Sequence, residues 1–267
     1  MITAGIDVGA KYAKIVVLED GKSILTRANG IVGFDILKSV TAVSEKALDG
    51  TGLKRDQITR IVATGMGRKA IHRTPPINAE EIVPDVIADA KGTHHLISTV
   101  KTVIDVGAEE GRGVKVDENG KVRDFVINER CAAGAGTFIE TMARALEVKV
   151  EDMGLLALKS TEAIPMNAQC CVFAESEVVT LIHSRVTKEN ISKAIHDAMA
   201  GRIASMVLRV GVEKDVALIG GVAQNPGFLP PLKKELNTEI IVPEHPQYVG
   251  AFGAALLALE MEGHQNE

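Results

Sequence analysis

The sequence contains no tryptophan, and only 3% of its 267 residues are aromatic. So few flat rings leave no surface on which the bases of a single-stranded nucleic acid could stack. Lys and Arg form no basic run, and the formal net charge is -5. Because nucleic-acid binding depends on clustered positive charge, we expect no nucleic-acid partner.

Long hydrophobic runs are also missing, because no stretch approaches the roughly 20 apolar residues of a membrane span. The N-terminal segment has no basic region followed by an apolar core, which is the pattern of a secretory signal. The three cysteines are an odd number, which argues against a disulfide framework. We therefore expect a cytoplasmic chain without a membrane partner, whose cysteines serve a metal, a redox group or the core.

A repeated pentapeptide, Ile-Asp-Val-Gly-Ala, occurs at Ile6–Ala10 and again at Ile104–Ala108. Each copy is followed by two apolar runs that are joined by an Asp-Gly or Asn-Gly turn, at Asp20-Gly21 and at Asn119-Gly120. Such turns between apolar runs predict β-hairpins. The duplication indicates two related lobes, and the hydrophobic fraction of 46% is typical of a well-buried α/β protein.

The chemistry that fits this repeat is the binding of nucleotide phosphates. A glycine after a strand lets backbone N–H groups close on phosphate oxygens, and a neighbouring carboxylate can hold Mg²⁺ or orient an attacking water. The bland alternative is two ordinary turns with solvated carboxylates, which the matched pair makes the weaker hypothesis. The predicted phosphate-loop residues are Asp7, Gly9, Ala10 and Lys11 in the first copy, and Asp105, Gly107 and Ala108 in the second.

A third nucleotide signal is the segment Gly220-Gly-Val-Ala-Gln-Asn225, which follows the apolar run Val216–Ile219. Paired glycines at the end of a strand allow a flat ring or a ribose to lie against the backbone. Gly220 and Gly221 would contact adenosine in this way, with Gln224 or Asn225 as polar contacts. An ordinary strand-to-helix turn is the alternative.

The order of these three motifs resembles the actin-like ATPase superfamily, which includes sugar kinases and heat-shock chaperone ATPases. The resemblance implies an α/β fold of two ribonuclease-H-like lobes. The first lobe would comprise residues 1–99, with phosphate loop 1, and be completed by the C-terminal helix 249–267. Residues 100–248 would form the second lobe, with phosphate loop 2, the cysteine motifs and the adenosine motif.

Apolar spacing predicts the remaining elements. Residues 74–84, with three prolines, are expected to form an irregular surface segment. The predicted helices are 34–49, 85–96, 138–146, 176–184, 191–210 and 249–261, and the predicted strands outside the hairpins are 58–63, 100–106, 216–219 and 239–242.

Cys131 and Cys170 each stand at the expected start of a helix, where unpaired N–H groups and the helix dipole stabilise a thiolate. Two thiolates are too few for a [4Fe–4S] cluster, which takes four, but a twofold dimer would supply the missing pair. The alternative is that both residues are small buried hydrophobic side chains.

Longer motifs around these cysteines resemble a narrower family. Asn128-Glu-Arg-Cys-Ala-Ala-Gly-Ala-Gly136 and Cys170-Cys-Val-Phe-Ala-Glu-Ser-Glu-Val178 are similar to the signatures of the 2-hydroxyacyl-CoA dehydratase activators and the benzoyl-CoA reductase ATPase subunits. The segments Ala63-Thr-Gly-Met-Gly-Arg68 and Tyr248-Val-Gly-Ala-Phe-Gly-Ala-Ala255 match as well. The resemblance covers essentially the whole chain.

This resemblance implies an ATP-hydrolysing homodimer or heterodimer that binds Mg-ATP or Mg-ADP and shares one [4Fe–4S] cluster. Cys131 and Cys170 would be the ligands, and Cys171 occupies a position that need not be cysteine. Reduced ferredoxin or flavodoxin would donate electrons. The protein would pass single electrons to an iron–sulfur acyl-CoA reductase or dehydratase component.

Departures from the family pattern affect the phosphate loops. Gly9-Ala-Lys11 replaces a Gly-Ser-Thr, Asp89-Ala stands where a His-Ala pair is common, and Asp105-Val-Gly-Ala-Glu-Glu110 replaces Asp-Ile-Gly-Gly-Gln-Asp. The beginning Ile2-Thr-Ala-Gly-Ile-Asp7 and the stretch from Asp105-Val-Gly-Ala to Gly111-Arg112 resemble the smaller ATPase subunit of benzoyl-CoA reductase more than the dehydratase activators. Glu109 or Glu110 would orient the attacking water, beside Asp105.

Two rival functions remain compatible with the lobes. A small-molecule kinase would use Asp105 as the base toward a sugar hydroxyl, but it gives no reason for cysteines at two helix starts. A partner-binding ATPase without redox chemistry would associate with its partner according to its nucleotide and would contain no iron.

Overall fold

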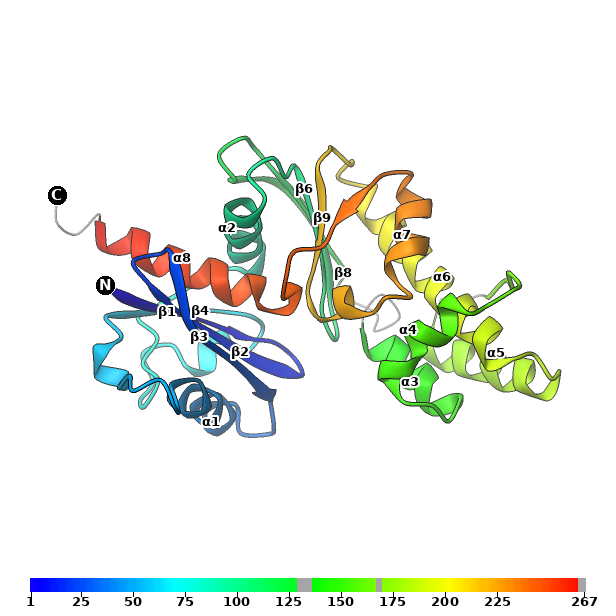
Figure 1. Ribbon diagram of the computed structural model, residues 1–267, viewed down its shortest axis with the longest axis horizontal. Coiled ribbons are helices and arrows are strands. Elements are labelled where there is room, and N and C mark those ends of the chain that lie inside the picture. Colours follow the sequence, from blue (N-terminus) through cyan, green and yellow to red (C-terminus); the bar gives the residue numbers. More distant parts are fainter. Residues whose placement is uncertain (129–135, 167–169, 264–267) are drawn as a thin grey trace. The chain divides into compact units, whose positions relative to one another are not determined.

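The computed structural model describes residues 1–128, 136–166 and 170–263 (Figure 1). The chain divides into two compact units. The first comprises Met1–Ser98, Asp117–Val122 and Tyr248–Glu267, and the second comprises Thr99–Val116 and Arg123–Gln247. Cys131 lies outside the described residues.

The first unit is built on a five-stranded sheet in the order β3-β2-β1-β4-β5. Strands β1 and β2 pair antiparallel, whereas β4 runs parallel to β1. The turn at Asp20 and Gly21, both with positive φ, joins β2 to β3, as the Asp-Gly signal predicts. The strands are β1 (Ile2–Val8), β2 (Tyr12–Glu19), β3 (Ser23–Ile31), β4 (Arg60–Thr64) and β5 (Glu81–Ile82).

Two helices pack on this sheet, α1 (Ile36–Leu48) and α8 (Val249–Gly263), and a third, α2 (Asp85–Leu96), packs against α8. Helix α1 is capped by Asp35, whose side chain accepts from the Lys38 N–H, and its apolar residues share a core with Ile6 of β1. Helix α8 packs on the sheet through small residues. A Cβ at Gly5 of β1 or at Gly253 of α8 would overlap neighbouring backbone. These glycines therefore let α8 lie directly on β1 and against α2, as Figure 1 shows.

The second unit repeats the sheet in the order β10-β9-β6-β7-β8. Here β7 pairs antiparallel with β6, and β9 runs parallel to β6 on its other side. The three central strands thus reproduce the antiparallel hairpin and the parallel strand of the first sheet. The strands are β6 (Thr102–Val106), β7 (Gly111–Val116), β8 (Val122–Asn128), β9 (Val216–Ile219) and β10 (Ile240–Ile241).

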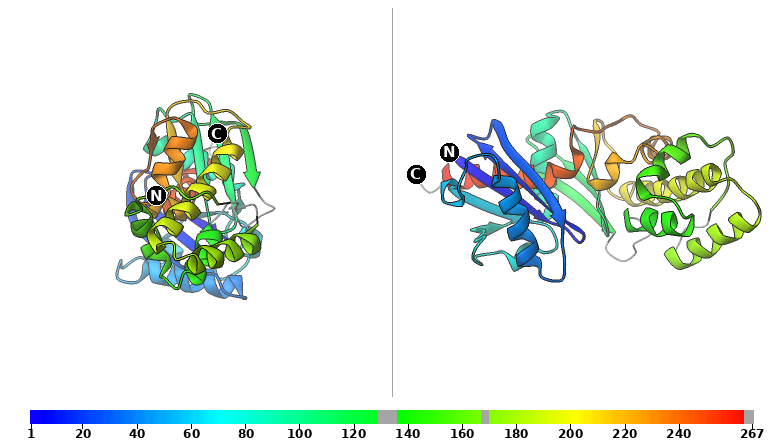
Figure 2. Two further views of the ribbon diagram at one scale, coloured as in Figure 1. Left: turned by 90° about the vertical axis from the view of Figure 1, so that its right-hand side faces the viewer. Right: turned by 60° about the horizontal axis from the view of Figure 1, so that its bottom comes forward.

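The helices of the second unit are α3 (Gly136–Ala145), α4 (Val150–Leu158), α5 (Cys171–His183), α6 (Lys188–Val207) and α7 (Leu229–Leu236). In the right-hand view of Figure 2, α3, α4 and α5, in green and yellow-green, lie together at one end of this unit. The inner faces of the helices and the sheet enclose one hydrophobic core. Its largest fully buried members include Phe138, Met142, Met153, Ile191 and Phe228.

The predicted fold class is confirmed: two mixed sheets with helices form the two lobes. The prediction for 85–96 matches α2, and that for 216–219 matches β9. The sequence did not predict α4 or α7. Residues 74–84 are more buried than expected, since Ile77 and Ala79 lie in the core of the first unit. The same segment also contains β5, Glu81–Ile82.

Candidate functional site

The first phosphate loop is the tip of the β1–β2 hairpin. The Gly9 N–H donates to the Tyr12 carbonyl (3.1 Å), which closes the turn around Ala10 and Lys11. Gly9, Ala10 and Lys11 are all partly exposed, so this turn can be reached from solvent. A tight, accessible turn of this kind suits phosphate oxygens.

Asp7 is the carboxylate at this loop, and it is held by a cation from the neighbouring strand. Asp7 faces Lys14 in the β1–β2 register, and Lys14 Nζ lies 2.8 Å from Asp7 Oδ2. Both side chains are mostly buried. Because the ammonium can contact both the carboxylate and an incoming anion, Asp7 and Lys14 together suit a phosphate accompanied by a metal ion.

The second phosphate loop has the same construction. The Gly107 N–H donates to the Glu110 carbonyl (2.9 Å) and closes the β6–β7 turn. Asp105 faces Arg112 in the register, and the guanidinium pairs with Asp105 through Nη1 and with Glu110 through Nη2. Asp105 and Arg112 are each about nine-tenths buried. Arg112 thus fixes both acidic side chains.

The seven-residue spacing from carboxylate to cation is therefore part of the repeat. Asp7 and Lys14, like Asp105 and Arg112, are opposite residues across an antiparallel pair. Sequence reasoning found the two carboxylates and missed the two cations. The signal was available: a basic residue stands seven positions after each Asp, where the hairpin register would place it.

The two candidates for orienting water differ in their surroundings. Glu110 is engaged by Arg112, whereas Glu109 is exposed at the tip of the loop. Glu109 is thus the acidic side chain of this turn that can swing toward a ligand.

Asp89 is a further carboxylate beside Asp7 that sequence reasoning noticed only as a departure from a family pattern. It lies on α2 and is 4% exposed. A Cβ placed on Gly250 would lie 3.1 Å from Asp89 Oδ1 and 3.8 Å from Asp7 Oδ2. Both carboxylates therefore approach the first turn of α8, where Gly250 leaves room for them.

The first glycine of the pair after β9 lies against the end of β6. Gly220 has φ +88°, and a Cβ there would overlap the Asp105 carboxylate. Glycine is required at this position by both the backbone conformation and the space. The structure thus brings Gly220 next to Asp105. Gly221 and Gln224 are exposed, whereas Asn225 turns inward, where its Oδ1 accepts from the Gly227 N–H (3.0 Å).

The loop after β4 serves packing within the first unit. Gly65 has φ +90°, and its Cα faces the Val8 backbone so closely that any Cβ would overlap it. The Gly67 N–H donates to the Val8 carbonyl (2.9 Å). The glycines of this loop thus allow the close approach of a neighbouring backbone.

Helix α3, which follows the Cys131 motif, is hydrogen-bonded to the second phosphate loop. The Gly136 N–H donates to the Gly107 carbonyl (2.9 Å), and the Thr137 N–H donates to the Ala108 carbonyl (2.8 Å). The Thr137 hydroxyl donates to the same Ala108 carbonyl (2.6 Å). These bonds satisfy donors of the first turn of α3, and they tie its start to the turn predicted to hold phosphate.

Cys170 and Cys171 differ in their positions at the start of α5. Cys170 is the N-cap residue, is half-buried, and makes no side-chain capping bond. Cys171 is the first helical residue, and its side chain packs on the core of the second unit. The predicted role of Cys131 falls outside the described residues.

A [4Fe–4S] cluster would fit the Cys170 position. This residue is partly accessible at a helix N-terminus, and a helix N-terminus stabilises the thiolate form that iron requires. Across residues 1–128, 136–166 and 170–263, no three or more His, Cys, Asp or Glu side chains are grouped to hold a metal ion. No helix in these ranges is long and apolar enough to cross a membrane.

Comparison with known proteins gives one family across almost the whole chain. The model of the BadF/BadG/BcrA/BcrD ATPase family matches residues 4–258. The activator of lactoyl-CoA dehydratase from Anaerotignum propionicum is 38% identical over 260 residues, covering 97% of this chain and 98% of that protein. One of the subunits of benzoyl-CoA reductase from Thauera aromatica is 31% identical over 265 residues, covering 96% and 92%.

Solved structures agree with this result. Component A of (R)-2-hydroxyglutaryl-CoA dehydratase from Acidaminococcus fermentans superimposes with a TM-score of 0.93 at 35% identity, covering 98% of this chain and 99% of that one. The activator of 2-hydroxyisocaproyl-CoA dehydratase from Clostridium difficile with bound ADPNP gives 0.93 at 35% identity, covering 100% and 97%. A glucokinase from Streptomyces griseus shares the fold, with a TM-score of 0.61 at 14% identity over 97% and 100%.

These comparisons correct one sequence-based preference. The loop departures favoured the smaller ATPase subunit of benzoyl-CoA reductase, but the dehydratase activator is more similar than the reductase protein, at 38% against 31% identity. The preference rested on a few loop residues, which vary more readily than the packed elements around them.

Proposed function

This chain belongs to the BadF/BadG/BcrA/BcrD ATPase family, and from that membership we propose that it is the ATP-hydrolysing activator of a 2-hydroxyacyl-CoA dehydratase. In this role it delivers single electrons, at the expense of ATP, to an iron–sulfur dehydratase component. Reduced ferredoxin or flavodoxin supplies the electrons. The similarity to dehydratase activators, which exceeds that to the benzoyl-CoA reductase protein, supports this choice of partner.

The observation that carries the proposal is the bonding of α3 to the second phosphate loop. Gly107 and Ala108 accept hydrogen bonds from Gly136 and Thr137, so a shift of the loop must move the start of α3 or break these bonds. The chain that leads into Gly136 carries Cys131, five residues earlier. A change of nucleotide at loop 2 would therefore move the start of α3, which follows the cysteine motif in the sequence.

The proposed nucleotide is Mg-ATP, and each phosphate loop has its own proposed role. Asp7, paired with Lys14, holds the metal ion through its waters and binds phosphate beside Gly9, Ala10 and Lys11. Asp105 with Glu109 orients the attacking water, and the Arg112 guanidinium keeps Asp105 in position. Gly107 and Ala108 contact phosphate, while Gly220, Gly221, Gln224 and Asn225 form the adenosine segment.

The proposed cofactor is one [4Fe–4S] cluster per dimer, ligated by Cys131 and Cys170 of both chains. Such a cluster supplies one-electron transfer when it is bound. Cys170 fits because it is the N-cap residue of α5 and is only partly buried, whereas Cys171 packs on the core. Two activator chains would make a homodimer. In the alternative, an ATPase subunit of benzoyl-CoA reductase, a second type of chain would provide the other two thiolates.

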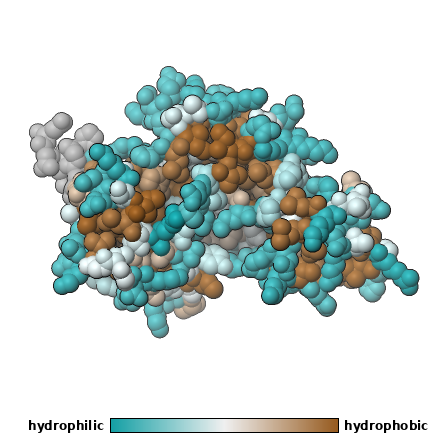
Figure 3. Space-filling view, in the orientation of Figure 1, coloured by the Kyte–Doolittle hydropathy of each residue, from teal (hydrophilic) through white to brown (hydrophobic). Residues whose placement is uncertain are grey.

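Exposed hydrophobic side chains on α5 fit an assembly through this region. Val172 and Phe173 are 68% and 71% exposed, directly after the cysteines. Figure 3 shows hydrophobic surface, in brown, over the helices of the second unit. An interface here would bring paired Cys170 residues together and cover Phe173.

The experiment is an activation assay under anaerobic conditions. The purified chain, a reductant and an inactive 2-hydroxyacyl-CoA dehydratase are mixed with Mg-ATP, and dehydration of the 2-hydroxyacyl-CoA is followed. We expect turnover with ATP and none with ADP or ADPNP. ATP hydrolysis without activation of dehydratases for several acyl chains, together with activation of benzoyl-CoA reductase, would support the reductase alternative. Phosphorylation of a sugar would support a kinase.

A further inference from the structure

His196 is a buried polar side chain that neither the phosphate loops nor the cysteine motifs explain. It lies in the middle of α6, is 1% exposed, and is surrounded by apolar core residues such as Ile195 and Met199. A buried imidazole is costly unless its nitrogens find partners. The partners of its two ring nitrogens therefore indicate its role in the structure.

One ring nitrogen faces α6 itself and the other faces a residue outside the helix. Nδ1 lies 2.7 Å from the Ser192 carbonyl oxygen one turn earlier, and Nε2 lies 3.2 Å from Asn225 Oδ1. Burial is the main influence on the pKa of His196 and lowers it, so the ring is neutral near pH 7 and carries one N–H. Both facing atoms are oxygens, so this single N–H can donate to only one of them. On Nδ1 it donates to the Ser192 carbonyl, and on Nε2 it donates to Oδ1 of Asn225, the last residue of the adenosine segment.

Asn225 stabilises the 3₁₀ turn that precedes it. Its N–H donates to the Val222 carbonyl (2.9 Å) and closes the 3₁₀ turn Gly221–Gln224. Its Oδ1 also accepts from the Gly227 N–H, so the carboxamide joins the turn to the segment before α7. With the side chain of Asn225 turned inward, the exposed members of the adenosine segment are Gly221 and Gln224.

Helix α4 packs closely against the same carboxamide. A Cβ on Gly154 would overlap Asn225 Oδ1 and would lie 2.8 Å from Pro226 Cδ. The Ser192 hydroxyl donates to the Met153 carbonyl (2.6 Å), which fastens α6 to α4 at this level. Asn225 is thus confined by the imidazole of α6 and the bare backbone of α4.

We propose that His196 is a positioning residue for nucleotide binding: the contact of its Nε2 with Asn225 holds the carboxamide inward and so sets the Gly220–Gln224 turn against adenosine. The inference rests on the proposed function and deepens it. Gln224 and the backbone of Gly221 then make the contacts to the nucleoside, while Asn225 braces them. Loss of the brace weakens nucleotide binding and leaves the chemistry at the phosphate loops in place.

Two substitutions at His196 separate its two contacts. In His196→Gln, the carboxamide nitrogen occupies the place of Nε2 and can donate to Asn225 Oδ1, so the contact is kept. In His196→Asn, the shorter carboxamide takes the place of Nδ1, stays beside the Ser192 carbonyl, and no longer reaches Asn225. Both replacements are neutral and polar. His183→Asn, at an exposed site in the last turn of α5, is the control, and Asn225→Ala removes the other partner.

The measurements are calorimetric titration with Mg-ADP, the kcat and KM for Mg-ATP, and the melting temperature without nucleotide, all on the full chain. Losing the link should weaken Mg-ADP binding and raise KM by about tenfold in His196→Asn and in Asn225→Ala, with kcat within about twofold. His196→Gln should stay within about threefold of the wild type in Kd and KM. The double variant His196→Asn with Asn225→Ala should bind no more weakly than either single variant.

Wild-type binding by His196→Asn or by Asn225→Ala would overturn the proposal, and so would equal weakening in His196→Gln and His196→Asn. If His196→Asn does not fold, the comparison of His196→Gln with Asn225→Ala decides in the same way. A wild-type chain that binds no Mg-ADP would instead refute the proposed nucleotide function, which keeps the two failures distinct.

Discussion

Asp7 and Asp105 have matched surroundings and are expected to have different roles. Each faces a cation across a hairpin, but the cation at Asp105 is a buried arginine that also binds Glu110. We predict that Asp105→Asn lowers kcat for ATP by about 100-fold, because a correctly placed carboxylate beside the attacking water is lost. Asp7→Asn should mainly raise KM, through weaker binding of the metal ion and phosphate.

Steady-state ATPase assays separate these effects, and Asp56→Asn, at an exposed site outside both loops, is the matched control. Thermal melts identify any loss of fold, since Asp105→Asn leaves Arg112 with one fewer carboxylate partner. Unchanged kcat and KM in both loop variants would contradict the roles assigned to these two carboxylates in ATP hydrolysis.

The adjacent cysteines allow a direct comparison. Cys170 is the N-cap residue of α5 and is half-buried, whereas Cys171, which is also half-buried, packs on the core. We predict that Cys131→Ser and Cys170→Ser each abolish the absorbance and the electron spin signal of the cluster, while Cys171→Ser retains both. Anaerobic reconstitution followed by both spectroscopies measures this. A full cluster in Cys170→Ser, with loss in Cys171→Ser, would exchange the roles of the two residues.

His196 also makes the fold sensitive to acid. Burial lowers the pKa of His196 below its ordinary value of 6.5. Just below that pH, the imidazole is therefore protonated in the unfolded chain while it is still neutral in the folded chain. Its contribution to stability is complete above pH 6.5 and is lost as pH falls, by at most about 1.4 kcal/mol per pH unit. Urea unfolding between about pH 7.5 and 5 should therefore show a shallower loss in His196→Gln than in the wild type.

At the scale of elements, the pattern of apolar residues predicted most of the fold. Helix α2 and strand β9 were predicted to the residue, because their apolar runs have clear ends. Helix α4 was not predicted, and it is short and contains Gly154. Helix α7 was not predicted either, and Pro230-Pro231 stand in it. Those prolines occupy the first turn, where a helix has no need of their N–H groups.

The candidate site was only partly visible in the sequence for a similar reason. Each motif was found where a glycine and a polar residue follow a strand. The partners of those motifs, namely Lys14, Arg112, Asp89 and His196, come from neighbouring strands or from helices distant in sequence. They depend on register and on tertiary packing, which a single sequence specifies only weakly.

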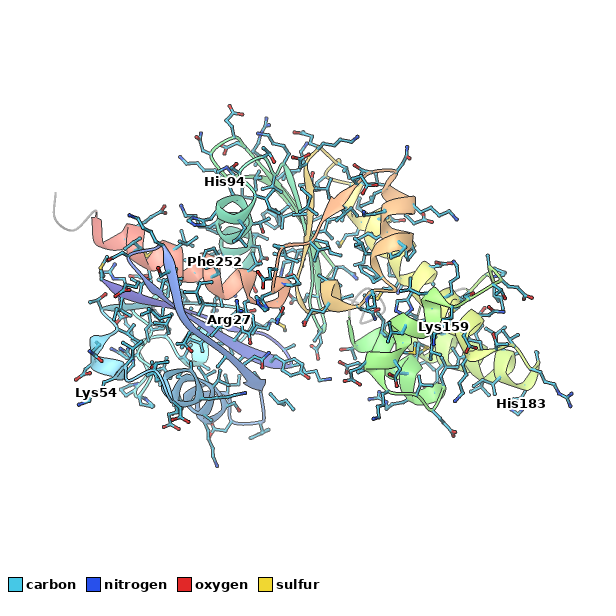
Figure 4. The ribbon with its side chains drawn as sticks, in the orientation of Figure 1. Arg27, Lys54, His94, Lys159, His183 and Phe252 are labelled. Carbon is cyan, nitrogen blue, oxygen red and sulfur yellow. The ribbon has the colours of Figure 1, made fainter. Side chains whose placement is uncertain are left out.

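Aromatic and ionic contacts in the first unit show the same dependence on packing. Arg27 of β3, labelled in Figure 4, lies 5.9 Å from the ring centre of Tyr248, just before α8. On α8 itself, Phe252 meets the His95 ring edge-on, with 5.3 Å between ring centres. Both contacts join the C-terminal segment to residues far away in the chain, where no local pattern indicates them.

Two glycines inside helices provide a test of the contact between α4 and the adenosine segment. A methyl group at Gly154 would overlap Asn225, whereas one at Gly201 of α6 would come no closer than 4.0 Å to Glu235. We predict that Gly154→Ala destabilises the chain by about 1–3 kcal/mol and weakens Mg-ADP binding. Gly201→Ala should stabilise it by about 0.5–1 kcal/mol, because alanine favours helix. Equal effects in chemical unfolding would contradict the packing described for Gly154.

At the scale of the whole molecule, the account requires an assembly of two chains. Each chain offers two proposed cluster ligands, and a [4Fe–4S] cluster takes four thiolates. We predict that removing iron with a chelator dissociates or weakens the dimer, because iron–sulfur bonds contribute to the interface. Size-exclusion chromatography of the protein before and after chelation measures this, with the Cys131→Ser variant as a control that should not respond to chelator.

Native mass spectrometry of the anaerobically purified protein in Mg-ADP tests the central claim most directly, because one spectrum reports chains, cluster and nucleotide together. The account predicts a species of two chains with one [4Fe–4S] cluster and one ADP for each chain. A single chain that carries a complete cluster, or a dimer that binds ADP and contains no iron after anaerobic reconstitution, would contradict it.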